Sequence, residues 1–367
     1  MADPFARVLG SFDEAGRMRH VLMEEVRGRY LDLDRDDVVA EHLAWVLGMT
    51  AMRIDPTRPH GPGNRAECRS VVVVGASGAG KSRLIRRAFA CNTALDDFAD
   101  QEAPRIAISV QLPSPCTLQT MGQAILAELG YEPERAPGEA VAWTRVRKLL
   151  ERRGILVVHL DEMHNATETA NVLELAKIRK TMKALMANPR WPVALIVSGL
   201  PHVTEFMEAV AVEPLPGQEP MTPVDRETEV RRRFRFVELQ PLALPTDLEV
   251  VKNAAANLAK MAGFDLPNDF ETEVAPRLLH ATLYQYGTCL EFIGDVIELM
   301  LTQEGSGTVM TLDRFADGYA KRTGNGAPMN PFVAPDWPKV DCRAILRERD
   351  DQAPRERASA SGRRRRS

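Results

Sequence analysis

The sequence predicts an α/β protein in which a parallel sheet of five strands is followed by a compact helical region. Five apolar, strand-like runs alternate with helical patterns up to about residue 243. From about 245 to 320 the strand signal stops and only helical periodicity remains. A glycine-rich loop also joins the first strand-like run to a helical pattern. Strands separated by helices of this length form βαβ units, and such units build parallel sheets.

Length and composition limit the classes of protein that this chain represents. Its 367 residues suffice for two domains with sizeable cores. With 47 basic and 51 acidic residues the net charge is −4, so a nucleic-acid surface must be a local patch. The five cysteines form no C-x-x-C pair and suggest reduced thiols. No apolar stretch approaches the roughly 20 residues that span a bilayer, so we expect a soluble cytoplasmic protein with no membrane partner.

The N-terminal part, residues 1–60, is expected to be a helical extension with a linker. Residues 1–50 carry apolar residues at helix-like intervals, and an acidic turn at 32–37 offers N-cap chemistry for the second helix. Residues 55–64 are rich in proline and glycine, which is typical of a linker. The extension is a candidate docking module, although no residue in it is diagnostic.

The α/β core is expected to cover residues 61–243. Its predicted strands are 71–74, 105–110, 155–160, 193–197 and 234–239, and its predicted helices include 117–129, 140–153 and 169–187. A helical domain at 244–322 is predicted from patterns at 246–262, 268–280, 288–301 and 311–320.

The C-terminal tail, residues 323–367, is expected to be largely disordered. It is rich in glycine, proline and charge, and it ends in four arginines at 363–366. These arginines either contact DNA or a partner, or simply end a disordered segment.

The glycine-rich segment at residues 75–82 reads Gly-Ala-Ser-Gly-Ala-Gly-Lys-Ser, a complete G-x-x-x-x-G-K-[ST] pattern known as Walker A. In such a loop, backbone N–H groups point at phosphate oxygens, the lysine reaches the β- and γ-phosphates, and the serine hydroxyl ligates Mg²⁺. We therefore predict that the chain binds ATP with Mg²⁺. The predicted nucleotide-binding residues are Gly75, Ala76, Ser77, Gly78, Ala79, Gly80, Lys81, Ser82 and Arg83, and Ser82 is also a predicted metal ligand.

A second acidic pattern suggests hydrolysis as well as binding. The apolar run at 155–160 ends in Asp161 and Glu162, which is a Walker B pattern. Asp161 is expected to hold Mg²⁺, and Glu162 to polarise the attacking water as a general base. A buried strand with a solvated acidic end is the alternative, and the Walker A segment upstream favours the catalytic interpretation.

Two further polar features follow later strands. Ser198 ends the strand at 193–197 and is predicted to sense the γ-phosphate or the lytic water; a turn or N-cap serine is the alternative. Residues 231–233, three arginines, precede the last strand. One of them, with Arg233 favoured over Arg231 and Arg232, is predicted to act as an arginine finger on a neighbouring subunit's nucleotide. The alternative is a solvated basic face.

Together these motifs resemble those of AAA+ ATPases, P-loop NTPases with a C-terminal helical lid. Within that superfamily, residues 161–165 (Asp-Glu-Met-His-Asn) and the strand running into residues 198–201 (Ser-Gly-Leu-Pro) are similar to the TniB family, related to TnsC. Residues 110–117 and the helix after them fit the same pattern. One departure is that residues 287–291 lack the lid arginine that often senses nucleotide in AAA+ proteins.

The resemblance implies an ATP-dependent helper of bacterial DNA transposition. Such a protein forms a ring or filament on duplex DNA in the ATP state and recruits a transposase and a target-selector protein. Hydrolysis, expected to be slow and stimulated by DNA or partners, then disassembles the homo-oligomer. DNA contact would be with phosphates and therefore largely independent of sequence. Its candidate residues on the helix after Walker B are Lys177, Arg179, Lys180 and Lys183, for which an exposed solubilising face is the alternative.

Two other functional classes are alternatives to this interpretation. One is a signalling NTPase switch that oligomerises without binding DNA, although the long repeat array usual in such switches is absent from the sequence. The other is a small-molecule kinase, which needs a mobile, arginine-rich lid that residues 246–320 do not resemble. An effect of duplex DNA on the ATPase rate or on sedimentation distinguishes the three classes.

Overall fold

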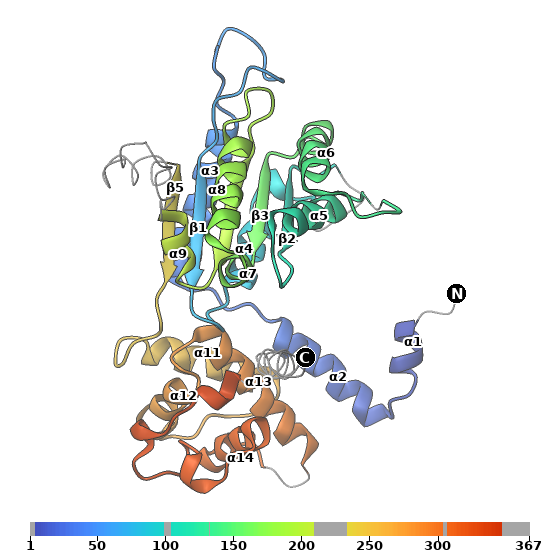
Figure 1. The fold of residues 1–367 in the computed structure, drawn as a ribbon. Coiled ribbons are helices and arrows are strands. Elements are labelled where there is room, and N and C mark those ends of the chain that lie inside the picture. The colour runs from blue at the N-terminus through green and yellow to red at the C-terminus, as the bar shows by residue number, and fades with distance from the viewer. Residues whose placement is uncertain (1–3, 99–103, 132, 209–232, 304–306, 347–367) are drawn as a thin grey trace, which may run out of the picture. The chain divides into compact units, whose positions relative to one another are not determined.

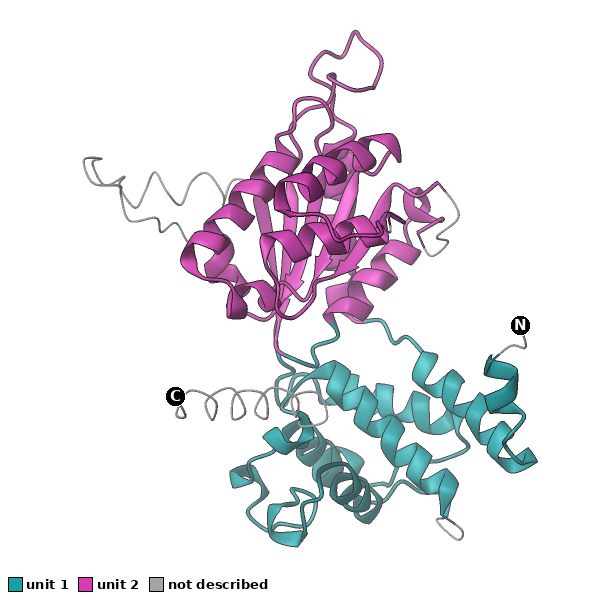
Figure 2. Ribbon diagram, turned by 45° about the vertical axis from the view of Figure 1, so that its right-hand side comes forward, with its two compact units in different colours: residues 1–32, 77–80, 241–367 teal, residues 33–76, 81–240 magenta. Residues whose placement is uncertain are grey.

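The computed structural model describes residues 4–98, 104–131, 133–208, 233–303 and 307–346. These residues divide into two compact units, which Figure 2 colours separately. The α/β unit contains residues 33–76 and 81–240, and the helical unit contains residues 1–32, 77–80 and 241–367.

A five-stranded parallel sheet is the centre of the α/β unit, which confirms the predicted fold class (Figure 1). The strands are β1 (Ser70–Gly75), β2 (Ala107–Gln111), β3 (Val157–Asp161), β4 (Ala194–Gly199) and β5 (Phe234–Leu239). Their order is β2-β3-β4-β1-β5, and every neighbouring pair is parallel. Because the strands are parallel, the segments that follow β1, β3 and β4 leave the sheet at one edge.

Helices cover both faces of this sheet. On one face α5 (Leu118–Glu128), α6 (Glu139–Arg152) and α8 (Val172–Met186) share a hydrophobic core with alternate strand residues such as Val158 and Leu160. Side chains of α3 (Asp34–Thr50) and α4 (Lys81–Ala90) lie against the other residues of the strands, including Val71 and Val73. The alternation follows from the two-residue period of a strand.

Shorter elements complete the α/β unit. They are η1 (Thr93–Leu95), α7 (His164–Thr169) and α9 (Val203–Glu208). Helices α5 and α8 are preceded by the N-cap residues Thr117 and Asn171. The side-chain oxygens of these residues accept backbone N–H groups of the first helical turn. Such N-caps satisfy donors that a helix leaves unpaired at its start.

The helical unit has a hydrophobic core of its own. Its elements are α1 (Pro4–Leu9), α2 (Glu14–Gly28), α11 (Leu248–Met261), the π-helical turn η2 (Phe270–Val274), α12 (Ala275–Ala281), α13 (Tyr286–Thr302), α14 (Leu312–Thr323), η3 (Ala327–Met329), η4 (Trp337–Lys339) and η5 (Arg343–Leu346). Met23 and Val26 of α2 are buried in this core.

The predicted domain boundaries differ from these units at the N-terminal side. The extension predicted at 1–60 divides, because α2 packs in the helical unit and α3 packs in the α/β unit. Val39, Leu43 and Val46 of α3 are buried. Apolar spacing identified both helices, but it does not state which core each helix joins.

The prediction of a largely disordered tail from residue 323 is wrong for residues 323–346. Phe332, Cys342 and Ile345 are buried in the core of the helical unit, and three short helical turns connect them. Their apolar side chains lack helical or strand periodicity, so the glycine- and proline-rich composition concealed them. Residues 347–367, with the four arginines at 363–366, lie outside the described residues.

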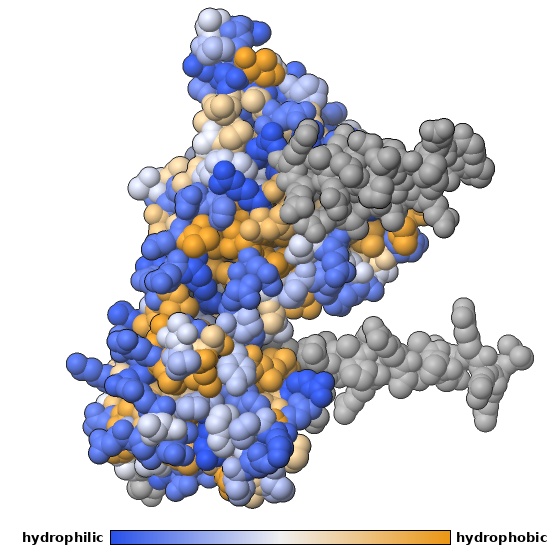
Figure 3. Space-filling view, turned by 90° about the vertical axis from the view of Figure 1, so that its left-hand side faces the viewer, coloured by the Kyte–Doolittle hydropathy of each residue, from blue (hydrophilic) through white to orange (hydrophobic). Residues whose placement is uncertain are grey.

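The surface is mixed in character. Figure 3 shows a face on which hydrophilic side chains predominate and apolar ones form patches. None of the helices in the described parts of the chain has both the length and the apolar character that crossing a membrane requires.

The packing of Phe332 leads to a stability prediction. Its ring is 3 % exposed and lies 5.7 Å from the Phe315 ring and 5.8 Å from the Phe292 ring. We expect Phe332→Ala to lower the free energy of unfolding by about 3–5 kcal/mol, because it removes buried area and leaves a cavity. Chemical denaturation measures this loss. The neighbouring Val333, 50 % exposed, is the control: Val333→Ala should cost less than about 0.5 kcal/mol, and equal losses would contradict the described packing.

Candidate functional site

The Walker A segment joins the end of β1 at Gly75 to the start of α4 at Lys81. Gly78 and Gly80 have φ angles of +79° and +89°, a left-handed region that favours glycine. The Lys81 side chain folds back over the loop, and its Nζ donates to the carbonyl oxygens of Gly75 (2.9 Å) and Ala76 (3.0 Å). The loop therefore has the compact glycine backbone of a phosphate cradle, with an ammonium group held beside it.

Three other predicted nucleotide-binding residues lie at or just before the start of α4. Ala79 is buried, Ser82 is half-buried and Arg83 is exposed on the first turn of α4. The Ser82 hydroxyl hydrogen-bonds the Asp161 carboxylate, so the structure brings together the two predicted metal ligands.

Asp161 ends β3 and is only 5 % exposed. Its Oδ1 accepts hydrogen bonds from Ser198 Oγ (2.6 Å) and from the backbone N–H of Glu162 (3.0 Å). Burial alone would raise the pKa of this carboxyl, but the polar His159 ring nearby and the hydrogen bonds from Ser198, Ser82 and Glu162 lower it by more. The pKa of Asp161 therefore lies below its usual value, and the group is a carboxylate at neutral pH.

Glu162 has an unusual backbone conformation. Its φ angle is +60°, which is strained for a residue with a Cβ and occurs often at functional sites. Its Oε2 lies 3.1 Å from Nε2 of His164, which begins α7. The predicted general base is thus held by a neighbouring imidazole.

The sequence did not single out His159. This histidine lies in the middle of β3, its ring is fully buried, and both ring nitrogens have hydrogen-bond partners. Desolvation lowers the pKa of His159 to about 4, so the ring is neutral at physiological pH. A polar residue within an otherwise apolar strand, two residues before the Walker B aspartate, was the available signal.

Ser198 lies on β4, fully buried, beside Asp161. Besides its bond to Asp161, its Oγ lies 2.8 Å from Nε2 of His159. The predicted role of Ser198 as a phosphate sensor stays a prediction. In the structure its hydroxyl group is engaged by two protein side chains.

Arg233 directly precedes β5, and its Nη1 lies 2.6 Å from Oε2 of Glu67. In the sheet Phe234 pairs with Ser70 and Leu239 pairs with Gly75, so Arg233 lies at the end of the sheet opposite the Walker A loop of its own chain. Arg233 is therefore too far along the sheet to contact the nucleotide of its own chain. Its role as a finger on another subunit's nucleotide stays a prediction. Arg231 and Arg232 lie outside the described residues.

The four candidate DNA contacts on α8 are not equivalent. Lys177 pairs with Glu174 (3.3 Å) and Glu139 (3.7 Å). Arg179 Nη1 donates to the carbonyl of Phe206 (2.9 Å), and its guanidinium lies 5.4 Å from that residue's ring centroid. Arg179 therefore packs against α9, whereas Lys180 is exposed and Lys183 partly exposed.

Within the helical unit, residues 77–80 contact the start of α13. The backbone N–H of Thr288 donates to the carbonyl of Gly78 (3.0 Å). A Cβ added to Gly287 would lie 2.5 Å from the same oxygen, so only glycine allows this approach. In the sequence, residues 287–291 are notable only because they lack the lid arginine. In the structure, the backbone N–H of Thr288 contacts the loop.

The residues fit a bound nucleotide with Mg²⁺. Mg²⁺ is usually held by one or two carboxylates or hydroxyls together with substrate phosphates, and Asp161 with Ser82 provides such a set. In the described part of the chain, no group of three or more histidine, cysteine or acidic side chains forms a separate metal site. The glycine loop and Lys81 have the chemistry that contacts to such phosphates require.

The sheet order, the Walker A loop and the Asp161–Glu162 pair define a P-loop nucleoside-triphosphate site in the fold of AAA+ proteins. The family model described as "AAA domain" matches residues 64–207. No curated protein matches the sequence.

Solved structures of similar fold include three archaeal proteins. Cdc6p of Pyrobaculum aerophilum matches with a TM-score of 0.52 and 11 % identity over 80 % of this chain and 70 % of that chain. Aeropyrum pernix ORC1, solved in complex with DNA, matches with a TM-score of 0.53 and 16 % identity, over 83 % of this chain and 69 % of that chain. Aeropyrum pernix ORC2, in ADPNP–ADP complexes, matches with a TM-score of 0.51 and 10 % identity, over 81 % of this chain and 71 % of that chain. At these identities the likeness concerns the fold.

The contact between α13 and the loop leads to a prediction about nucleotide affinity. The carbonyl of Gly78 and the next N–H, of Ala79, point in opposite directions across their planar peptide. By holding this carbonyl, Thr288 fixes the direction of a phosphate donor. We expect Gly287→Ala, which forces the backbones apart, to weaken binding of a fluorescent ATP analogue by about 3- to 10-fold.

A second glycine of the same helix supplies the control. A Cβ on Gly294 meets no atom within 4 Å, so Gly294→Ala should leave the affinity unchanged and stabilise α13 slightly. Equal affinities of both variants would show that the contact does not shape the loop.

Proposed function

We propose that the protein is an ATPase that assembles on duplex DNA and acts as a helper in DNA transposition. The observation that carries the ATPase part is the convergence of Lys81, Ser82 and Asp161 at the end of β1 and β3, with Glu162 next to them. These residues provide phosphate binding, metal binding and a general base.

Each residue has a defined task in this proposal. When bound, Mg²⁺ would neutralise charge on the β- and γ-phosphates, and Ser82 and Asp161 are the residues to hold it. Lys81 exchanges its carbonyl partners for phosphate oxygens, which accept from an ammonium more strongly than peptide carbonyls do. Glu162 accepts a proton from water once its carboxylate leaves His164. The pairing of Glu162 with His164 is consistent with slow turnover in the absence of a stimulating partner.

The transposition part of the proposal has two supports. Residues 161–165 and 198–201 resemble the TniB family in sequence. The fold is similar to that of Aeropyrum pernix ORC1, a protein solved in complex with DNA. Because the whole chain carries a net charge of −4, DNA contact requires a local set of cations. On α8, Lys180 is exposed and Lys183 partly exposed, and both are candidates for this set.

Subunit contact is the third part of the proposal. An arginine that completes a neighbour's site makes assembly and nucleotide occupancy depend on each other. Arg233 is the described candidate for this role. The remaining proposed partners are a transposase and a target-selector protein.

Two substitutions test the ATPase. Lys81→Ala should abolish detectable ATP binding because it removes the ammonium group held against the loop backbone. Glu162→Gln should keep ATP affinity and lower kcat by about 100-fold or more, because the amide cannot accept the proton. Equilibrium binding and phosphate release measure the two effects. Normal affinity in the first variant, or unchanged turnover in the second, would refute the assignments.

Assembly is tested by electron microscopy and sedimentation of the Glu162→Gln protein with ATP and duplex DNA, beside samples lacking each. We expect rings or filaments that require both ligands and that dissolve as salt rises, because phosphate contacts release counterions. Arg233→Ala should prevent assembly and leave ATP affinity intact. Arg190→Ala is the matched control, because Arg190 is also a surface arginine paired with one glutamate, Glu151. Particles indifferent to DNA would favour an NTPase switch or kinase and overturn the DNA part.

A further inference from the structure

We infer that a hydrogen-bonded chain of three side chains, the half-buried Ser109 and the fully buried His159 and Ser198, positions the Walker B aspartate for metal binding. This inference rests on the proposed role of Asp161 as a Mg²⁺ ligand. Ser109, His159 and Ser198 are positioning residues, because they act through Asp161 rather than on the nucleotide.

The chain crosses three neighbouring strands on one face of the sheet. Ser109 of β2 pairs in register with His159 of β3, and Oγ of Ser109 lies 2.8 Å from Nδ1 of His159. On the other side of the ring, Nε2 lies 2.8 Å from Oγ of Ser198 on β4. The Ser198 hydroxyl in turn lies 2.6 Å from Oδ1 of Asp161.

The chemistry of these groups fixes the direction of the two hydrogen bonds nearest to Asp161. The Asp161 carboxylate only accepts, so the single proton of Ser198 points at Oδ1. The proton between His159 and Ser198 must then belong to Nε2, which donates to the serine oxygen. On the other side of the ring, Nδ1 faces the Ser109 hydroxyl. The hydrogen bonds therefore link Ser109 through His159 and Ser198 to Asp161.

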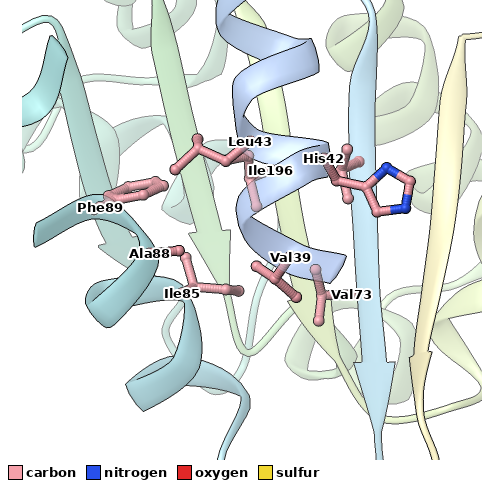
Figure 4. A pocket seen from close by; sticks show the side chains of 9 residues that line it. Val39, His42, Leu43, Val73, Ile85, Ala88, Phe89 and Ile196 are labelled. Atoms are coloured by element: carbon pink, nitrogen blue, oxygen red, sulfur yellow. The ribbon is translucent and has the colours of Figure 1, made fainter. Parts of the chain in front are cut away.

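The surroundings make this chain effective. The His159 ring makes an edge contact with Phe89 of α4, with ring centroids 6.1 Å apart. Phe89 also lines the apolar pocket in Figure 4, where Val39 and Leu43 of α3 face Val73 and Ile196 of the sheet. Hydrogen bonds in such apolar surroundings are stronger than in water, and each polarises the next.

The consequence concerns the orientation of the aspartate. Oδ1 receives two hydrogen bonds, from Ser198 Oγ and from the backbone N–H of Glu162, and these fix the plane of the carboxylate. Partners of this kind orient metal ligands and tune their affinity. While the chain is intact, the proton of Ser198 is committed to Asp161, so Ser198 acts on the metal ligand and not on the γ-phosphate.

The main experiment measures how the full-length variants depend on Mg²⁺. ATPase rates are titrated with free Mg²⁺ at saturating ATP, and binding of a fluorescent ATP analogue is measured with Mg²⁺ and with chelator. We expect Ser198→Ala to raise the apparent Mg²⁺ dissociation constant by about 10- to 100-fold. Ser109→Ala, which leaves Nδ1 of His159 without its hydrogen-bond partner, should raise it by about 3- to 10-fold. Metal-free nucleotide binding should not change in either variant.

Matched controls separate this effect from a general loss of a buried hydroxyl. Ser70 of β1 is also fully buried, and its Oγ contacts Met186 Sδ (2.9 Å) and accepts from the Leu195 backbone (2.9 Å), outside the chain. Ser70→Ala should leave the Mg²⁺ dependence as it is in the unmodified protein. Ser109→Thr keeps a hydroxyl group at this position, and its Mg²⁺ dependence should match that of the unmodified protein.

Asp161→Asn separates the failure of this inference from that of the proposed function. If Asp161→Asn does not change the Mg²⁺ dependence, the proposed metal site is wrong. If it does, but Ser109→Ala behaves as Ser70→Ala does, the metal site stands and the positioning chain is refuted.

The protonation of the His159 ring can be measured on the unmodified protein, so this test does not depend on whether a variant folds or keeps its activity. Selective ¹⁵N labelling of the seven histidines, with His159→Gln used only to assign the signal, reports which ring nitrogen carries the proton. We expect a ring that carries a proton on Nε2. A ring protonated on Nδ1 alone would reverse the chain, because Nε2 would then need the proton of Ser198, and the inference would be overturned.

Discussion

A carboxylate that is only 5 % exposed must be surrounded by hydrogen-bond donors, and the parallel sheet supplies them to Asp161. Because β3 and β4 run in the same direction, their carboxyl ends place Asp161 and Ser198 side by side. The Walker A helix adds the Ser82 hydroxyl. The metal-binding half of the proposed site thus depends on strand direction, and the loop chemistry is arranged around it.

Much of this arrangement was predictable because it is local in the sequence. The apolar runs that became β1 to β5 and the glycine pattern at 75–82 each occupy a short continuous segment. The order of the strands follows from packing, and it was the neighbouring position of β3 and β4 that brought Asp161 and Ser198 together. For this reason the main strands and helices, and the residues proposed to hold the metal, could be named from the sequence.

The rest depended on contacts between distant segments. His159 gains its meaning from the register of three strands, which sets Ser109 on one side of its ring and Ser198 on the other. Thr288 contacts Gly78 through its backbone, which leaves no trace in residue type. Phe332, Cys342 and Ile345 are spaced without period, so only the packed core shows that the segment around them is ordered. Side-chain patterns predict elements well, but they carry little information on such partners.

The backbone of Glu162 has a consequence for how this position can change. Its φ of +60° suits glycine or asparagine better than a residue with a long side chain. If folding stability alone acted on the position, mutation would tend to replace glutamate with one of these residues. Glutamate at this position lowers the folding stability of the chain through local backbone strain, but it provides a carboxylate there. Strain of this kind is found where activity rather than stability determines the residue.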